Sequence, residues 1–271
     1  MTASSTTIAF DRPTPPALRV FGALLGRDLT VARRNFVGVL ISTALQPFML
    51  TVVFGVLLPS MGFVGDAYKA ALLPGVIAVT LMLSSLQAVA LPMVIEFGHT
   101  HQMEDRLLAP VGTATLVAEK IFAGTLQATI AALLVLPIAR LTMGPVPGLA
   151  LGNLGPIVLF TVLGALLFST MGMVLGTAVP PQQVNLLFSA LLTPLISFGC
   201  AYYPWAGLTR IPALQIAVLV NPLVYVAEGL RGALTPTTPH MPAPATLAAL
   251  IAMSATLWWV GQRTFERRAI K

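Results

Sequence analysis

The sequence predicts an all-α integral membrane protein with six transmembrane helices, an N-terminal amphipathic helix at the membrane interface, and an outer re-entrant helical hairpin between spans five and six. Two observations lead to this fold class. Of the 271 residues, 56% are hydrophobic and only 9% are charged, whereas soluble domains carry about 25% charged residues. Charged residues are also absent from several stretches of about 20 residues, the length that crosses roughly 30 Å of hydrocarbon as a helix. A chain of this composition needs lipid around it.

The N-terminal region is the first element. Residues 1–16 are rich in Ser, Thr and Pro and lack the apolar segment of a signal peptide, so we expect a flexible cytoplasmic tail. In residues 17–35, apolar residues recur at helical spacing among arginines: Leu18, Phe21, Leu25, Leu29 and Ala32. This pattern predicts an amphipathic helix along the inner leaflet, with its arginines toward anionic headgroups. The alternative is a basic flank of the first span.

The uncharged runs give the predicted spans. They cover residues 37–59, 70–95, 121–139, 154–179, 184–203 and 245–262. Pro180 and Pro181 separate the fourth span from the fifth, because proline ends a helix. Gly172 and Gly176 form a GxxxG pattern in the fourth span, which lets two helices approach closely; local packing is its expected role.

The basic residues predict the orientation. With six spans and the N-terminus inside, eleven Lys and Arg residues fall on the cytoplasmic side and four outside, as the positive-inside rule requires. Residues 211–227 are uncharged too, but they contain Pro212 and Pro222 and reach only about 26 Å as a helix. Counting them as a seventh span would place the basic C-terminus outside, so we interpret them as re-entrant.

These elements give the expected organisation of the chain. A cytoplasmic tail over 1–16 and an interfacial helix over 17–35 precede a six-span domain over 36–262. That domain includes a cytoplasmic loop at 96–118 and an outer hairpin at 204–243, and a basic cytoplasmic tail follows over 263–271. Because the basic residues flank apolar spans instead of covering one face of a folded domain, we expect no nucleic-acid partner.

The cytoplasmic loop is the first candidate site. His99, His101, Glu104 and Asp105 could bind a metal in principle, but their spacing matches no standard site, and we expect none. A short surface helix is the favoured interpretation. Its charged turn would face water, whereas Leu107 and Leu108 need apolar cover from the membrane or from another protein.

The second candidate site lies before the last span. Glu228 and Arg231 are three residues apart, on one face of a helix, where they can pair and lower the cost of holding either charge near lipid. The alternative is an ordinary interfacial pair at the outer surface. The single cysteine, Cys200, lies in an apolar run, and we expect a small buried hydrophobic residue.

Several patterns are absent from the sequence. It contains no G-x-x-x-x-G-K-[ST] motif and only three lysines, so we expect no nucleotide hydrolysis by this chain. No Asp or Glu lies within the predicted spans, which disfavours an ion-coupled transporter, although sodium sites built from carbonyls leave that alternative open. The lack of a polar cluster also disfavours a membrane-embedded enzyme.

Two motifs resemble those of a known family. The run Glu104-Asp105-Arg106-Leu107-Leu108-Ala109-Pro110-Val111, followed by Leu116-Val117-Ala118-Glu119-Lys120, resembles the cytoplasmic loop of type-two ATP-binding-cassette (ABC) transporter permeases. The run from Asn221-Pro222-Leu223 through Glu228-Gly229-Leu230-Arg231-Gly232-Ala233-Leu234 resembles the segment before the last span of the same family. The chain departs from the pattern at Ala109, where family members often have Thr before Pro, and at His99 and His101.

The resemblance implies an exporter permease in a bacterial plasma (inner) membrane, with both termini cytoplasmic and roles in drug efflux and antibiotic resistance. It would move a drug, lipid or glycan-type substrate out of the cytoplasm or inner leaflet. The expected partners are two copies of an ABC ATPase subunit and a second permease chain, in a homodimer or a paralogous heterodimer. This chain would bind no cofactor, and ATP and Mg would bind the ATPase. The alternative is an ion-coupled secondary transporter.

The resemblance also implies residue roles. Those assigned to ATPase coupling are Glu104, Asp105, Arg106, Leu107, Leu108 and Pro110. The candidates for the substrate path, taken from the second and fifth spans, are Gln87, Phe188, Thr193 and Phe198. Glu228 and Arg231 would fix the shape of the outer hairpin.

Overall fold

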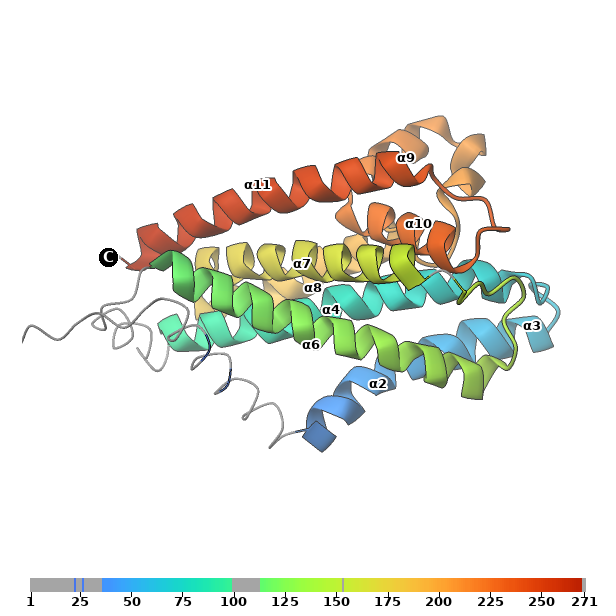
Figure 1. Ribbon diagram of the computed structural model, residues 1–271, viewed down its shortest axis with the longest axis horizontal. Coiled ribbons are helices and arrows are strands. Elements are labelled where there is room, and N and C mark those ends of the chain that lie inside the picture. The colour runs from blue at the N-terminus through green and yellow to red at the C-terminus, as the bar shows by residue number, and fades with distance from the viewer. Residues whose placement is uncertain (1–21, 23–25, 27–35, 99–112, 153, 270–271) are drawn as a thin grey trace, which may run out of the picture.

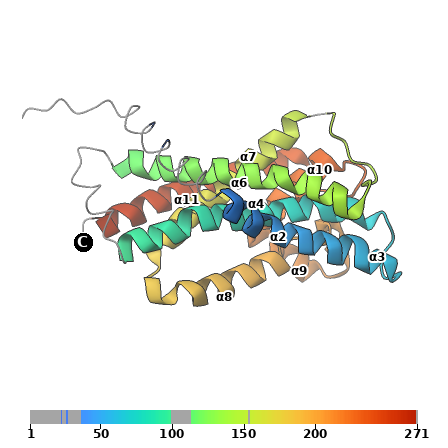
Figure 2. The ribbon, with the colours of Figure 1, turned by 90° about the horizontal axis from the view of Figure 1, so that it is seen from below.

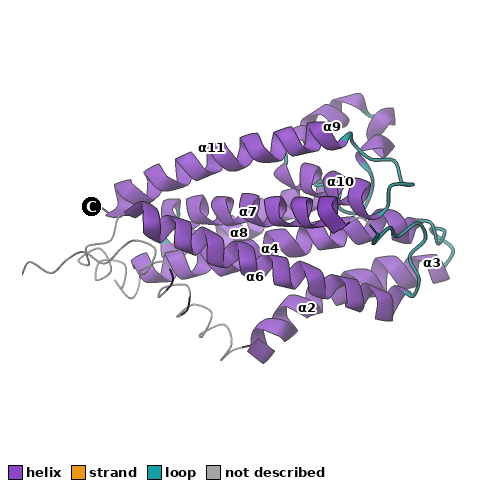
Figure 3. Cartoon of the chain, in the orientation of Figure 1, coloured by secondary structure: helices purple, strands orange, loops and turns teal. Residues whose placement is uncertain are grey.

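The computed structural model describes residues 22, 26, 36–98, 113–152 and 154–269 (Figure 1). Within these residues the regular structure is entirely helical, and no strand is present (Figure 3). The helices are α2 (Phe36–Val52), the π-helical η1 (Val53–Leu57), α3 (Leu58–Ser60), α4 (Tyr68–Gly98), α6 (Thr113–Met143), α7 (Leu154–Ala178), η2 (Pro181–Gln183), α8 (Val184–Ser197), η3 (Trp205–Arg210), α9 (Pro212–Ala217), η4 (Val218–Val220), α10 (Pro222–Leu234) and α11 (Ala243–Ala269). The all-α class predicted from the sequence is confirmed for these residues.

Four helices are long and apolar enough to cross a membrane. They are α4, α6, α7 and α11, and they lie along the long axis of the molecule (Figure 1). α4, α7 and α11 finish at the same end, which we name the inner end after the expected orientation; the opposite end is the outer end. The expected spans 70–95 and 154–179 match α4 and α7 closely, and the expected sixth span 245–262 lies within α11.

The expected first and fifth spans form shorter apolar helices over 44–60 and 188–197. α8 ends at Ser197, before the predicted residue 203, because the chain turns at Cys200, whose φ of 51° is left-handed. α7 and α11 run in the same direction, and α8 runs in the opposite direction at the edge of the bundle, on the side away from α7 (Figure 2). The count of six spans stays a prediction.

Two segments differ from the expected loop and tail. α6 begins at Thr113, so the end of the expected loop 96–118 is helical; Leu116 and Val117 are buried there with Val89 and Met93 of α4. Residues 99–112 lie outside the described part of the chain. α11 continues to Ala269, which makes most of the expected basic tail helical. Of the expected amphipathic helix 17–35, only Gly22 and Gly26 are described, and both are helical.

The segment expected to be re-entrant is sharply bent. The pair Pro212–Val220 and Pro222–Leu234 meets at an angle of 100°. The break falls at Asn221, whose side chain accepts a hydrogen bond from the Leu223 N–H at 2.9 Å and so caps α10. Its amide group donates to the Leu195 carbonyl of α8 at 2.8 Å. An Asn-Pro pair thus ends one helix and begins another.

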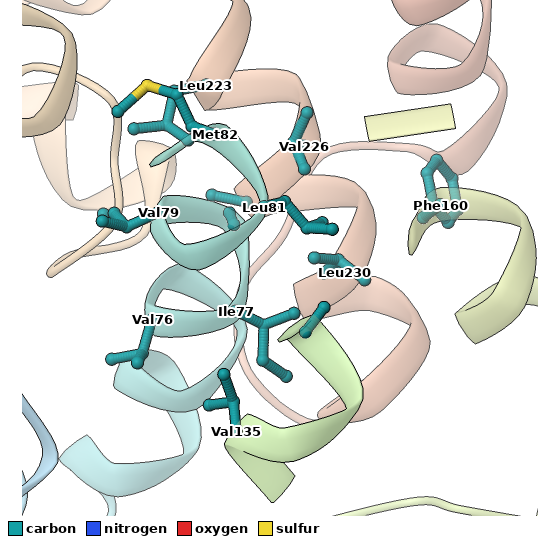
Figure 4. Packing of buried hydrophobic residues seen from close by; sticks show 14 of the residues in the cluster. Val76, Ile77, Val79, Leu81, Met82, Val135, Phe160, Leu223, Val226 and Leu230 are labelled. Carbon is teal, nitrogen blue, oxygen red and sulfur yellow. The ribbon is translucent and has the colours of Figure 1, made fainter. Parts of the chain in front are cut away.

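The core lies around α4. Its largest cluster joins α4, α6, α7 and α10 through residues such as Ile77, Val135, Phe160 and Leu230 (Figure 4). Small residues allow the close approach: a Cβ added at Gly176 would lie 2.6 Å from the Cβ of Met93, and one at Gly172 would lie 3.2 Å from the Cβ of Val89. The GxxxG pattern therefore packs locally against α4, as expected.

Candidate functional site

Glu228 lies at the centre of a buried polar cluster at the outer end. Its Oε1 accepts hydrogen bonds from the Trp205 N–H at 2.8 Å and from Nη1 of Arg231. Its Oε2 accepts from the Met241 N–H at 2.8 Å. Trp205 opens η3 and Met241 lies just before α11, so one carboxylate joins the entry and the exit of the predicted outer hairpin.

Arg231 extends this cluster to α4 and to the turn after α8. Its Nη2 donates to the carbonyl oxygens of Ala71 at 3.1 Å and of Cys200 at 2.9 Å, and its Nε donates to Ala71 at 3.3 Å. Ala71 lies in the first turn of α4, and the left-handed Cys200 lies in the turn where α8 ends. We call Glu228, Arg231 and these four backbone partners, at Ala71, Cys200, Trp205 and Met241, the outer polar cluster.

The two charged side chains of the outer polar cluster are completely buried. The side chains of Glu228 and Arg231 are both 0% exposed, so they are not a solvent-facing pair at the outer surface. Taking such charges out of water costs several kcal/mol per ion unless they are paired and hydrogen-bonded. Both ions meet that condition, and the arrangement therefore fixes several chain segments relative to one another.

The end of α10 is held by further hydrogen bonds. The Thr235 hydroxyl donates to the Ala70 carbonyl at 3.0 Å, and the Ala150 N–H donates to the Leu234 carbonyl at 2.8 Å. A Cβ added at Gly75 would lie 1.7 Å from the Ala201 carbonyl oxygen, so α4 also passes very close to the turn after α8. Sequence reasoning missed these contacts, because no local pattern reports a partner so distant along the chain.

A second polar cluster lies at the inner end. Nζ of Lys120 lies 3.3 Å from Oε1 of Glu96, and the two side chains are 7% and 12% exposed. Glu119, the residue before Lys120, is also buried. Glu96 and Glu119 thus lie within the long apolar helices α4 and α6, although near their inner ends. The ion pair joins α4 to α6 near their inner ends.

Arg268 holds the inner ends of α7 and α11 together. Its Nη1 donates to the carbonyl oxygens of Gly176 at 3.2 Å, Thr177 at 2.9 Å and Val179 at 3.2 Å. Gly176 and Thr177 belong to the last turn of α7, and Val179 directly follows the helix; backbone acceptors at a helix end lack partners within the helix. The hydroxyls of Thr177 and Thr264 are also 2.8 Å apart. From the sequence, Arg268 could be recognised only as a basic residue after the last predicted span, and its contact with α7 could not be foreseen.

The candidate substrate-path residues lie on α4 and around α8. Gln87 and Thr193 are exposed, and Phe198 is 48% exposed. Phe188 is partly buried against Val94 and Val179. Three of the four therefore lie on the surface of the single chain, and the described residues alone do not enclose a path around them.

The candidate coupling residues Glu104, Asp105, Arg106, Leu107, Leu108 and Pro110 lie outside the described part of the chain, as do His99 and His101. Among the residues that the structure describes, no group of three or more His, Cys, Asp or Glu side chains could hold a metal ion.

A comparison with protein families places these features in a known context. The family model described as ABC-2 type transporter matches residues 19–235, which is well over half of the chain. The match ends one residue after α10. It therefore includes both Glu228 and Arg231, as well as the segment between α4 and α6. A comparison with curated proteins finds no match.

Proposed function

The chain belongs to the ABC-2 type transporter family and is the membrane-spanning permease component of an ABC transporter; from this premise we propose that it is the permease subunit of an exporter. In this proposal it moves a hydrophobic or amphipathic substrate, of the drug, lipid or glycan type, out of the cytoplasm or the inner leaflet. A separate ATPase subunit binds ATP and Mg and supplies the energy. The family match over residues 19–235 is the observation that carries the proposal.

The ATPase docks on the segment between α4 and α6 in this proposal. Leu107 and Leu108 supply the apolar contact, and Glu104, Asp105, Arg106 and Pro110 orient it. The ion pair between Glu96 and Lys120 supports this role, because it joins the two helices from which the segment emerges. A movement of the segment would then act on α4 and α6 together.

At the outer end, the hairpin 204–243 closes the substrate path. The outer polar cluster supports this role, since Glu228 and Arg231 connect the hairpin to the beginning of α4 and to the turn after α8. Any displacement of α4 would therefore reach the hairpin directly. Glu228 and Arg231 act here as positioning residues and do not contact the substrate.

Two permease chains enclose the path in this proposal. The exposed positions of Gln87, Thr193 and Phe198 support a path that one chain alone leaves open. The same face of α4 continues with Leu91 and Ile95, which are 37% and 51% exposed. Gln87, Leu91 and Ile95 are all uncharged. An uncharged lining favours an apolar or amphipathic substrate, because an unmatched buried charge is costly.

We further propose that the chain has six spans, that both termini are cytoplasmic, and that the protein lies in a bacterial inner membrane.

The test is to express the chain together with a candidate ABC ATPase subunit and to purify the complex through a tag on this chain. We expect the ATPase to co-purify, and liposomes containing both proteins to export an apolar dye only when ATP is supplied. Dye movement by this chain alone, driven by a proton or sodium gradient and indifferent to ATP, would show that it is an ion-coupled transporter instead.

A further inference from the structure

The outward face of α11 changes its chemical character along its length. Of the four spanning-length helices α11 is the least enclosed: 17% of its apolar window is buried, against 72% for α4. The exposed residues on this face follow at helical spacing and include Ala248, Ile251, Ala252, Ala255, Trp259, Arg263, Glu266 and Arg267. Small and aliphatic side chains suit contact with acyl chains, whereas Trp followed by Arg is typical of the membrane–water interface.

The length of α11 places this interface at the same residues. The helix rises about 30 Å between Ala243 and Arg263 at 1.5 Å per residue, which equals the thickness of the hydrocarbon core. With Ala243 at one boundary of the hydrocarbon, Arg263 reaches the lipid headgroups at the other. Trp259, one turn earlier, lies where an amphipathic ring is best accommodated.

Trp259 and Arg263 form a stacked pair. Cζ of Arg263 lies 3.7 Å from the centroid of the Trp259 ring, within the range of a cation–π interaction. Trp259 is 52% exposed. Stacking uses the flat face of the guanidinium and leaves its in-plane N–H groups available to an anion, since those donors point outward from its edge.

Arg267 adds a second cation to the same face. It follows Arg263 by four residues and is exposed like it, so the two guanidinium groups lie about one turn apart. The exposed Glu266 lies between them in the sequence, but within the described residues neither arginine forms an ion pair with an acidic side chain. The adjacent Arg268 differs, because it donates to the carbonyls of α7. Arg263 and Arg267 therefore outnumber Glu266, and the face carries a net positive charge at headgroup depth.

We propose that Trp259, Arg263 and Arg267 bind the phosphate of an anionic phospholipid in the leaflet at the inner end, which is the cytoplasmic leaflet in the orientation proposed above. The two guanidinium groups donate N–H hydrogen bonds to the phosphate oxygens. The indole packs against the beginning of the acyl chains, in continuity with the apolar face from Ala248 to Ala255. This site requires neither the ATPase nor a transported substrate.

The test uses native mass spectrometry of the full-length chain with added phosphatidylglycerol or phosphatidylcholine. We expect the unmodified chain to retain phosphatidylglycerol more strongly than phosphatidylcholine, and inorganic phosphate not to displace it. The double variant R263Q/R267Q should bind phosphatidylglycerol at least about tenfold more weakly. The matched control R140Q/R210Q removes two exposed arginines near the outer end and should retain the lipid.

Equal retention of the two lipids, or unchanged phosphatidylglycerol binding in R263Q/R267Q, would overturn the proposal. The variant R263K/R267K keeps both charges without the guanidinium fork and should bind with intermediate strength, which separates lipid recognition from loss of folding. Unchanged lipid retention together with weaker co-purification of the ATPase would show that the face contacts a protein and that the lipid site is wrong.

Discussion

Arg231 donates from Nη2 to the backbone carbonyl oxygen of Ala71 at 3.1 Å, although the two residues are 160 positions apart in the sequence. Ala71 lies in the first turn of α4, and Arg231 lies near the end of α10. The contact joins the beginning of the most enclosed helix to the outer hairpin. Because Glu228 balances the charge of Arg231, the connection is stable only as a pair.

Separating this pair should destabilise the protein strongly. Removing one partner of a buried ion pair leaves an uncompensated charge and costs about 3–5 kcal/mol, so we expect this loss in both E228Q and R231M. The double variant E228Q/R231M should lose less than the sum of the two. Reversible unfolding in detergent, evaluated as a double-mutant cycle, measures the difference.

The matched control for the buried pair lies at the same end of the molecule. Asp66 and Lys69 are also three residues apart, with Asp66 78% exposed and an N–O distance of 2.8 Å. D66N and K69M should each change the stability by less than about 1 kcal/mol. Additive losses in the Glu228–Arg231 cycle would mean that the two charges act independently.

Gly75→Ala should destabilise the contact between α4 and the turn after α8. The new Cβ would lie 1.7 Å from the Ala201 carbonyl oxygen, and this neighbour is backbone. Overpacking of this kind typically costs about 1–3 kcal/mol or more. Thermal unfolding measures the effect, and Gly65→Ala is the control because its Cβ would meet nothing within 4 Å. Equal melting temperatures of the two variants would contradict the packing described.

Arg268→Gln should loosen the inner end of α7. The substitution removes the donor to the Gly176, Thr177 and Val179 carbonyls, and unsatisfied buried groups cost about 1–3 kcal/mol. Hydrogen exchange should therefore become faster in the peptide covering the end of α7, with little change in α6. Arg140→Gln, at an exposed site on α6, provides the control, and identical exchange in both variants would contradict the assigned role.

Changing Leu107 and Leu108 together to Ser should weaken binding of the ATPase. Burying one such side chain in a partner groove contributes roughly 1.5–3 kcal/mol, so the loss should reach a few kcal/mol, or hydrolysis should become uncoupled from transport. L141S/L151S is the control, because Leu141 and Leu151 are 85% and 47% exposed near the outer end. Normal co-purification and transport in the Leu107/Leu108 variant would assign coupling to another segment.

The two chain positions Pro239 and Lys271 should face opposite sides of the membrane. Pro239 belongs to the expected outer hairpin, and Lys271 to the expected cytoplasmic terminus, on the basis of the positive-inside rule. Sidedness reporters fused at each position measure this directly. The same compartment at both positions would contradict the proposed six-span orientation.

The sequence predicted best those helices whose ends carry their own local signals. α7 was expected over 154–179 and is observed over Leu154–Ala178, because Pro180 and Pro181 end the apolar run. The break at Asn221 carries a similar signal in Pro222. In both cases the backbone restriction acts on the neighbouring residues alone, and a single chain segment contains all the information.

Features that depend on distant partners could not be predicted in this way. The spacing of Glu228 and Arg231 favoured a pair, but their complete burial depends on Ala71, Cys200, Trp205 and Met241, which come from three other regions of the chain. Arg268 was expected to be one of several topology-determining charges. Its partner is a helix end whose position only the tertiary structure defines.

The turn at Cys200 has a practical consequence for labelling experiments. Cys200 is the single cysteine in the sequence, and its side chain is 0% exposed. Thiol reagents need access to a thiolate, so the unmodified chain should react slowly with maleimides while it is folded. Cysteines introduced at Gln87, Thr193 or Trp259 can then carry fluorophores or spin probes without a prior cysteine-free background. Faster reaction of Cys200 with a maleimide would in turn report unfolding of the outer end, because unfolding exposes the thiol.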